Sequence, residues 1–260
     1  MIERDFTLKK YTELCEAIVS SSYVPMTIQE YLNQHPDKSI ILRHDVDRKP
    51  DRAQKMALIE HEHGIRSTYY FRTVKEVFQP DIIRNIADLG HEIGYHYEVL
   101  DKAKGDVNKA IEIFGQELKD LREIASIKTI CMHGNPLTSW LNRDLWTNYS
   151  FDNFGIIGEA YLSIDYKNVF YLSDTGRRWN SRFSVKDVVK VNDNDLYKNI
   201  RNTDDVINHI NEGLHKQICI LTHPNRWNDN FIGWLNELIL QSIKNIGKAG
   251  IIWWKNPRKQ

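Results

Sequence analysis

Short runs of β-branched and aromatic residues alternate along the chain with longer amphipathic stretches. The strongest runs predict strands at 39–43, 68–71, 92–95, 129–132 and 218–222. Amphipathic periodicity predicts helices at 50–64, 80–89, 107–125, 204–214 and 231–246. Strands that alternate with helices are typical of a mostly parallel sheet. The pattern therefore predicts an α/β protein, in which the region 149–191 adds several short strands.

Capping residues support two of the predicted helices. Pro50 suits the first turn of a helix, because this turn leaves its N–H groups unbonded, and Gly64 suits the end of the same helix. Asp106 is a predicted N-cap for the helix at 107–125, whose apolar residues recur at steps of three and four. These residues define the helix limits independently of the apolar pattern.

No linker rich in proline, glycine or serine divides the chain, which closes with an apolar run from Gly250 to Trp254. The 260 residues, of which 41% are hydrophobic, suffice to bury a large core. We therefore expect a single domain over residues 1–260, with an N-terminal helical extension over residues 1–37.

The charges balance, with 35 Lys and Arg against 35 Asp and Glu, so the chain as a whole has no attraction to nucleic acid or anionic lipid. Local basic spots occur at Arg177-Arg178 and from Lys255 to Lys259. The three cysteines form no C-x-x-C pair, which favours a reducing compartment. No run approaches the roughly 18 apolar residues of a membrane span. We expect a cytoplasmic protein without a membrane span or a nucleic-acid partner.

Histidines and carboxylates directly follow four of the predicted strands. The clusters are His44-Asp45-Val46-Asp47, His96-Tyr97-Glu98, His133-Gly134-Asn135 and Thr222-His223-Pro224. Because the carboxyl ends of the strands in a βα barrel surround one mouth, where such folds place active sites, the clusters are expected to meet there. Capping or packing is the alternative for any single histidine. Four coincidences together indicate one shared polar site.

Spacing sorts the candidates, because a strand advances about 3.3 Å per residue and alternates its faces. Asp45 and Asp47 share a face, whereas His44 points the other way and is expected to pack or to form hydrogen bonds. His91 precedes His96 by five residues. This separation places it roughly 16 Å away, at the other end of the strand, so it is excluded from the site.

The remaining side chains form a ligand set for zinc or another divalent first-row metal. They are Asp45, Asp47, His96, His133 and His223. Such an ion polarises a carbonyl and lowers the pKa of a bound water from about 15.7 to about 7, which creates a nucleophile at neutral pH. A carboxylate free of the metal would act as base, and a histidine on the opposite side would protonate the leaving group. The set therefore indicates hydrolysis of an amide or an ester.

Motifs between about Ile40 and Trp227 resemble those of the polysaccharide deacetylases with the NodB-homology domain, which is carbohydrate esterase family 4. The matching segments are His44-Asp45-Val46-Asp47, Gly90-His91-Glu92-Ile93-Gly94-Tyr95-His96 and Leu221-Thr222-His223. By this resemblance Asp45 is the general base and Asp47 a metal ligand. His96 is a further ligand, and His223 is the general acid. The family's fold implies a distorted (β/α) barrel with about seven parallel strands.

One position departs from the family pattern. The family usually has a second metal histidine four residues after the first, and this chain has Leu100 there. His133, at the end of a neighbouring strand, is the preferred replacement for this metal ligand. One alternative is Glu98, which lies on the same face as His96. The other alternative is that the chain has no tight metal site. The family's arginine-containing third motif is not evident around residues 131–136. We therefore expect a variant subfamily, with zinc as its metal.

The segment Asp174-Thr175-Gly176-Arg177-Arg178-Trp179 resembles the family's fourth motif, whose residues line the groove and orient the base. The resemblance implies supporting roles for Asp174, Arg178 and Trp179. Asn135, in the cluster that follows its strand, is a further candidate for substrate binding. An arginine beside a carboxylate would keep it ionised and fixed. A solvated turn is the alternative, because Asp-Thr-Gly is ordinary turn chemistry.

The expected function is that of a metal-dependent hydrolase that removes an acetyl group from an amino sugar or glycan, in surface polysaccharide metabolism. One alternative is a metal-independent amidohydrolase of the same superfamily that acts on a small C–N substrate. Another is a catalytically decayed carbohydrate-binding protein, which would not need the base Asp45. A glycosidase with Asp45 and Glu98 about 5 to 9.5 Å apart would leave His133 and His223 without roles.

Overall fold

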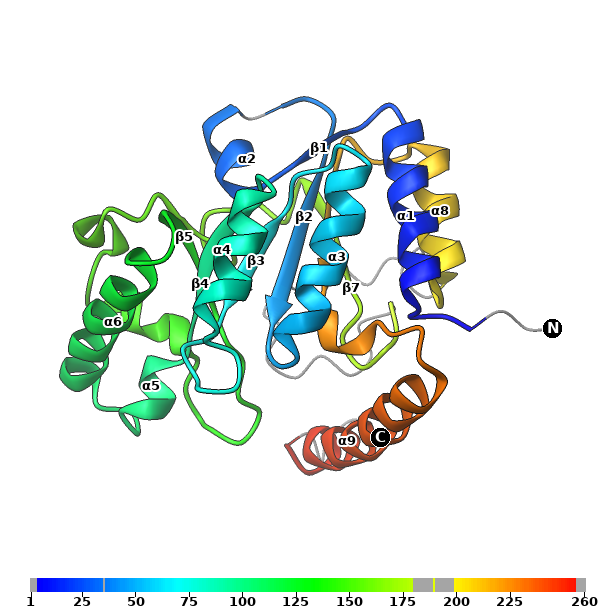
Figure 1. Ribbon diagram of the computed structural model, residues 1–260. Coiled ribbons are helices and arrows are strands. Elements are labelled where there is room, and N and C mark those ends of the chain that lie inside the picture. Colours follow the sequence, from blue (N-terminus) through cyan, green and yellow to red (C-terminus); the bar gives the residue numbers. More distant parts are fainter. Residues whose placement is uncertain (1–3, 35, 180–188, 190–198, 256–260) are drawn as a thin grey trace.

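The computed structural model describes residues 4–34, 36–179, 189 and 199–255 (Figure 1). The described strands are β1 (Val24–Met26), β2 (Ser39–Val46), β3 (Thr68–Phe71), β4 (Glu92–Tyr97), β5 (Ile127–Met132), β6 (Gly158–Glu159), β7 (Val169–Ser173) and β8 (Gln217–Thr222). The described α-helices are α1 (Leu8–Ser20), α2 (Ile28–Gln34), α3 (Pro50–Glu62), α4 (Pro80–Asp88), α5 (Val99–Lys102), α6 (Val107–Arg122), α8 (Thr203–Glu212) and α9 (Phe231–Lys255). Three short 3₁₀ helices complete the set: η1 (Asn142–Thr147), η2 (Phe151–Phe154) and η3 (Pro224–Arg226).

The strands form one sheet in the order β6-β5-β4-β3-β2-β8-β7, with β1 joined to β2 outside this path. Each of these pairings is parallel. Strand β2 pairs along one edge first with β1 and then with β3, so the N-terminal region 1–37 contributes a strand as well as two helices. In the described residues β6 and β7 are not paired with each other, so the sheet curls without closing. The predicted fold class, a distorted (β/α) barrel, is confirmed.

The central strands are buried on both faces, which explains why their sequences read as continuous apolar runs. Every residue of β2, β3 and β4 is buried. Helices α4 and α6 pack on β3, β4 and β5, and an aromatic group around Phe114 and Trp146 fills the space between them. Helices α1, α3 and α8 cover β2, β7 and β8 around Trp179 and Trp227. Helices therefore lie outside the sheet, and the strand ends remain available for a site.

The predicted helix limits hold at the capped positions. Helix α3 starts at Pro50 and is followed by Gly64 with a φ of 68°, a conformation that favours glycine. The side chain of Asp106 accepts a hydrogen bond from the Lys109 N–H at the start of α6. Helix α9 is longer than predicted, because it continues through the apolar run 250–254. In the part of the chain that the structure describes, no helix combines the length and apolarity needed to cross a bilayer.

The parallel strands point their carboxyl ends to one side of the molecule. In Figure 1 this is the lower side, toward which the arrowhead of β2 points, and α9 lies beneath it. The four clusters predicted from the sequence lie at or just after the carboxyl ends of β2, β4, β5 and β8, at this side. The three cysteines, Cys15, Cys131 and Cys219, are buried and form no disulfide.

Candidate active site

Three histidines converge on one carboxylate, Asp47, which follows β2. The Nε2 atom of His96, on β4, lies 3.4 Å from Asp47 Oδ1. The Nε2 atom of His133, just after β5, lies 3.6 Å from the same oxygen. His223, just after β8, places its Nε2 atom 3.9 Å from Asp47 Oδ2. The structure thus brings four of the five predicted catalytic and metal residues together around a single side chain.

The other ring nitrogen of each histidine faces an acceptor of the protein. His96 Nδ1 donates to the Cys131 carbonyl oxygen at 3.0 Å, and His223 Nδ1 contacts the Asp174 carboxylate at 2.7 Å. His133 Nδ1 lies 3.2 Å from Glu98 Oε2 but forms no hydrogen bond with it among the described residues. An acceptor at Nδ1 favours the tautomer whose Nε2 lone pair is free. The Nε2 lone pairs of His96 and His223 are therefore directed toward Asp47, where, together with His133 Nε2, they could bind a cation.

Asp47 is the polar centre of the cluster, and its environment suits a positive ion. Its Oδ1 atom is buried and has no hydrogen-bond partner among the described residues. Burial opposes ionisation, but contact with His96 and the charges of His133 and His223 outweigh it and lower the pKa of Asp47 well below its ordinary value. Ligand atoms of a tetrahedral zinc ion lie about 3.3 to 3.4 Å apart, given bonds of about 2.0 to 2.1 Å. The spacings of 3.4 and 3.6 Å from Oδ1 to the two nitrogens fit such a donor set.

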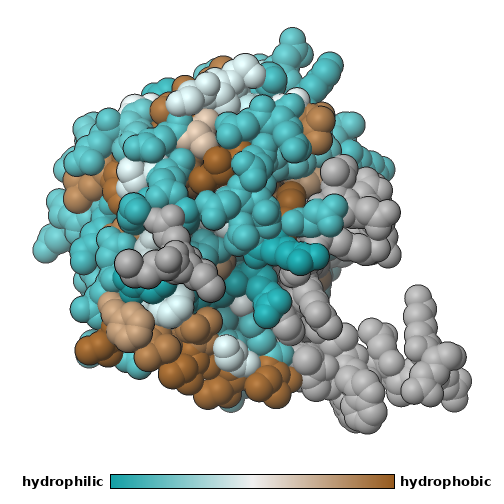
Figure 2. Space-filling view, turned by 90° about the vertical axis from the view of Figure 1, so that its right-hand side faces the viewer, coloured by the Kyte–Doolittle hydropathy of each residue, from teal (hydrophilic) through white to brown (hydrophobic). Residues whose placement is uncertain are grey.

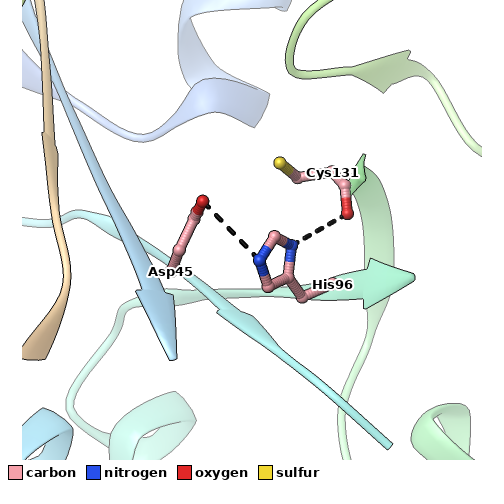
Figure 3. A group of neighbouring side chains, drawn as sticks. All are labelled: Asp45, His96 and Cys131. Carbon is pink, nitrogen blue, oxygen red and sulfur yellow. Dashed lines mark hydrogen bonds and ion pairs between the residues drawn. The ribbon is translucent and has the colours of Figure 1, made fainter. Parts of the chain in front are cut away.

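A second set of potential ligands lies beside the first. Among the described residues, Asp45, His96 and Cys131 form the one group of three whose ligand atoms all lie within 4.8 Å of one another. Figure 3 shows His96 between Asp45 of β2 and the main chain of Cys131 on β5. However, Arg43 Nη2 donates to Asp45 Oδ2 and to Cys131 Sγ, both at 2.7 Å. This guanidinium would repel a metal ion, so the Asp47 set is the better match.

The Asp47 set is more open than the Asp45 set. The ligand atoms of Asp47, His96 and His133 do not all lie within 4.8 Å of one another. The two imidazole rings would therefore have to turn toward each other to bind one ion. The rings are perpendicular, with an interplanar angle of 89° and centroids 5.3 Å apart. Burial lowers the pKa of His96, but Asp45 and Asp47 outweigh it, so the pKa of His96 is raised. A metal would therefore compete with a proton for this nitrogen.

Asp45, the predicted base, is held by an arginine that the sequence analysis did not single out. Arg43 donates from Nε to Asp45 Oδ1 at 2.9 Å and from Nη2 to Oδ2 at 2.7 Å, and both side chains are buried. Burial raises the pKa of Asp45, but the charge of Arg43 exceeds this effect and lowers it. Residues two apart on a strand share a face, so the spacing of Arg43 and Asp45 could have revealed the pair.

Glu98 is a partner of His133 and of Arg72, a second arginine that the sequence analysis missed. Arg72 Nη2 donates to Glu98 Oε2 at 2.7 Å, and its Nη1 donates to the Asp47 carbonyl oxygen at 3.1 Å. Burial raises the pKa of Glu98, but His133 and then Arg72 outweigh it and lower the pKa to about 2. A carboxyl group this acidic cannot act as general acid at neutral pH, which argues against a glycosidase. Arg72 directly follows β3, a strand end that the four clusters did not include.

Asp174, at the end of β7, supports His223. Its Oδ2 atom accepts hydrogen bonds from the His223 N–H at 2.9 Å and from Trp227 Nε1 at 3.0 Å. Arg226 donates to the Asp174 carbonyl oxygen at 2.6 Å and also contacts the carboxylate. Burial raises the pKa of Asp174, but Arg226 and then His223 outweigh it and lower it. Asp174 therefore orients the predicted acid, whereas the family's fourth motif suggested that it orients the base.

Three predicted supporting residues lie outside this cluster. Trp179 is fully buried, stacks with Phe6 and donates from Nε1 to Thr203 at 3.2 Å, so it belongs to the core. Arg178 is exposed and lines a separate hollow formed with α9. The turn through Gly176 and Arg177, both with positive φ, separates these residues from Asp174. The side chain of Asn135 caps its own loop by accepting a hydrogen bond from the Leu137 N–H at 3.0 Å.

The two histidines set aside by spacing belong to a different polar cluster, on the opposite face of β2. His44 contacts Glu60 Oε1 at 2.8 Å and Thr222 Oγ1 at 2.6 Å. His91 contacts the Ala57 carbonyl oxygen at 3.0 Å and lies 3.6 Å from Glu60. We call these residues, with Tyr11, Ser67 and Tyr69, the Glu60 cluster.

No family model matches the chain, and no curated protein does so either. Among solved structures, the chain is similar to a CE4 family pseudoenzyme from Bacillus anthracis, with 15% identity, a TM-score of 0.42 and coverage of 81% of this chain but only 62% of that one. A family 4 carbohydrate esterase from Bacillus anthracis has 13% identity and a TM-score of 0.40, with coverage of 91% and 86%. PdaA, a family 4 carbohydrate esterase of Bacillus subtilis, has 13% identity and a TM-score of 0.40, with coverage of 89% and 82%.

Proposed function

We propose that the protein is a metal-dependent hydrolase that removes an acetyl group from an amino sugar or glycan. The main observation behind the proposal is that a buried carboxylate oxygen, Asp47 Oδ1, has no hydrogen-bond partner among the described residues and lies 3.4 and 3.6 Å from two imidazole Nε2 atoms. A buried carboxylate oxygen that accepts no hydrogen bond is costly, so a cation bound between these atoms would stabilise it. Carboxylate and imidazole are ligands that zinc prefers.

Asp47, His96 and His133 would hold the ion, and their orientation supports this role. The Cys131 carbonyl oxygen fixes His96, and Glu98 faces the distal nitrogen of His133. Such outer contacts are typical of metal-binding histidines, because they select the tautomer and aim the ring. When bound, the metal would supply Lewis-acid polarisation of the acyl carbonyl and lower the pKa of a water molecule.

Asp45 and His223 would carry the protons of the reaction, each from a position in the cluster around Asp47 and His96. Asp45 lies 3.7 Å from His96 and is kept ionised by Arg43, so it can accept a proton from the attacking water. His223 approaches the other oxygen of Asp47 and can give a proton to the departing nitrogen or oxygen of the sugar. The contact with Asp174 fixes the ring of His223 for this transfer.

The saccharide as substrate is supported by the motifs, whereas the acyl hydrolysis is supported by the geometry. The segments 44–47, 90–96 and 221–223, which include the carboxyl ends of β2, β4 and β8, resemble those of a family that deacetylates carbohydrates. With His133 after β5, their side chains would provide a base, an acid and a metal set in one cluster. This combination suits amide or ester hydrolysis and not glycoside cleavage, because Glu98 is engaged by Arg72.

Acetate release provides the test of this function. The purified protein is incubated with N-acetylated chito-oligosaccharides and with O-acetylated xylan, before and after treatment with a chelator. We expect release that is lost on chelation and restored by zinc. His61→Ala is the matched control, because this exposed histidine at a helix end lies outside the cluster and should leave the release unchanged. Release that persists after full metal removal would contradict the metal-dependent assignment.

A second candidate is a metal-independent amidohydrolase, which the position of Arg43 favours. This guanidinium already supplies a cation between Asp45 and Cys131, and the Asp47 set is open. Hydrolysis of a small cyclic amide that is unaffected by chelation would support this candidate. Saccharide binding without any release would instead indicate a decayed site.

A further inference from the structure

Helix α9 differs from an ordinary surface helix, because buried polar side chains face the protein and apolar side chains face outward. Two of its polar residues, Glu237 and Gln241, are buried, at a spacing of four. Six of its apolar residues are between 48% and 74% exposed: Phe231, Ile232, Ile239, Leu240, Ile243 and Ile246. Figure 2 shows apolar residues gathered along the lower edge of the molecule, where α9 lies in Figure 1. We call these six residues the α9 apolar face.

The inward orientation of the polar side is fixed by specific hydrogen bonds. Glu237 Oε1 accepts from Arg48 Nη2 and from Asn225 Nδ2, both at 3.0 Å. Asn245 Nδ2 donates to the Gly176 carbonyl oxygen at 3.0 Å. These contacts secure α9 next to the strand ends, since Arg48 follows Asp47 directly. The outward position of the apolar face therefore follows from the packing of the helix.

The charge of this segment is one-sided, although the whole chain is neutral. After Glu237 the sequence contains no Asp or Glu, and its cations are Lys244, Lys248, Lys255, Arg258 and Lys259. Near the start of the helix, the Arg4 guanidinium lies over the rings of Phe231 and Trp234, 5.5 and 5.7 Å from their centroids. Among the described side chains, Lys244 is exposed on the same helix and Arg4 lies over its first turn, so cations lie beside the apolar face.

We infer that the α9 apolar face docks onto an anionic lipid surface. A helix with apolar side chains on one face and flanking cations lies in the plane of the headgroup boundary. Anionic lipid attracts each nearby Lys or Arg. A second copy of the chain fits less well, because pairing two such faces would bring two sets of cations together. The balanced overall charge therefore conceals a local basic and apolar surface.

Docking of this face would bring the strand ends close to the membrane, because α9 lies on their side of the molecule (Figure 1). The substrate class would then be an acetylated saccharide carried on a lipid or presented at the membrane surface. This extension rests on the proposed function, whereas the docking itself does not. Vesicle binding measured without substrate therefore tests the surface independently of the activity.

The experiment is co-sedimentation of the full chain with vesicles. Wild type is mixed with phosphatidylcholine vesicles and with vesicles that also contain phosphatidylglycerol, at low and at high salt. We expect binding to the anionic vesicles that weakens at high salt, and little binding to the neutral ones. The test variant Ile239→Asn/Ile243→Asn should weaken binding at least about tenfold, because it removes two membrane-facing apolar side chains.

The matched control is a variant with two apolar-to-asparagine substitutions outside α9. Leu58→Asn/Leu214→Asn replaces two exposed apolar residues outside α9, so it should bind as wild type does. Light scattering of the lipid-free protein should show a monomer. Failure of wild type to bind anionic vesicles would overturn the proposal. So would equal losses in the two variants, or a dimer that only the α9 variant disrupts, since the face would then join copies of the chain.

Discussion

Two polar clusters lie on opposite faces of β2, and they differ in how completely their carboxylates are bonded. Glu60 is fully buried and bonds to the hydroxyls of Ser67 at 2.6 Å and Tyr69 at 2.7 Å. It also bonds to Tyr11 and to His44. Asp47, on the other side, has a buried oxygen with no hydrogen-bond partner among the described residues.

This difference separates a structural cluster from a chemical one. A buried carboxylate with a full set of donors stabilises the fold and has no remaining capacity for a ligand. A buried carboxylate oxygen that faces imidazole lone pairs instead costs stability unless something binds there. Histidine alone does not mark a site, since His44 and His91 are as buried as His96. The bonding of their partners distinguishes them.

The largest effects are expected where the proposed proton transfers occur. Asp45→Asn and His223→Ala should each lower turnover by roughly 10² to 10⁴, because general acid and base catalysis contributes about that much. Metal content should be unchanged in both variants. Turnover is measured as acetate release at saturating substrate, and metal content by elemental analysis.

An activated ester separates the acid from the base. Its leaving group departs without a proton, so it should restore much of the turnover of His223→Ala and little of that of Asp45→Asn. Equal losses of the two variants on this ester would show that His223 is not the acid. A fully active Asp45→Asn protein would refute the base assignment.

The next effect concerns the third metal ligand. His133→Ala should weaken zinc binding by at least about 10², whereas Glu98→Gln, which alters only a partner of His133, should weaken it by about 10 to 100-fold. A competition titration against a zinc-binding dye gives both affinities. A larger loss for Glu98→Gln would move the ligand role to Glu98.

The third effect is expected in the Glu60 cluster, and it concerns stability and not activity. Burial raises the pKa of Glu60, but His44, through its charge and its hydrogen bond, outweighs it and lowers the pKa from 4.5 to about 2. A lowered pKa contributes stability that is present above pH 4.5 and lost as the pH falls toward 2. Glu60→Gln should therefore reduce the free energy of unfolding at neutral pH by about 3 kcal/mol.

Urea unfolding at several pH values measures this contribution. Between pH 4.5 and 2 the variant should lose less stability than wild type, although Glu98, whose pKa is also about 2, titrates in both. Asp47→Asn is the comparison, and it should cost less stability because the Asp47 side chain is a quarter exposed. A larger loss for Asp47→Asn would reverse the distinction between the two clusters.

The fold was predictable because the apolar runs and the capping residues in the sequence mark strands and helices that the structure contains. Alternating apolar runs identified β2, β3, β4, β5 and β8, and Pro50, Gly64 and Asp106 marked helix limits. Strand β1 was not predicted, because three residues give too short a pattern and only their pairing with β2 defines them. The predicted helix at 231–246 was too short, because the apolar run at 250–254 was expected to be separate from it and not a continuation of α9.

The site was predictable only where residues lie at or just after the carboxyl end of a strand. Asp47, His96, His133 and His223 were found in this way, since parallel strand ends meet. Arg43 and Arg72 were not predicted, because the expected chemistry concerned the histidines and carboxylates at the strand ends. The burial of Trp179 depends on contacts with Phe6 and Trp227, and no local pattern encodes such distant packing.

Metal stoichiometry of Asp47→Ala tests the central claim most directly, with His96→Ala beside it. Each variant is dialysed against zinc, washed and analysed for metal content per chain, and its far-UV spectrum confirms that it has folded. We predict about one equivalent of zinc in wild type and essentially none in either variant, because both residues lie at strand ends and face one point. A full equivalent of zinc in Asp47→Ala, or none in wild type, would contradict the assignment of this cluster as a metal-dependent active site.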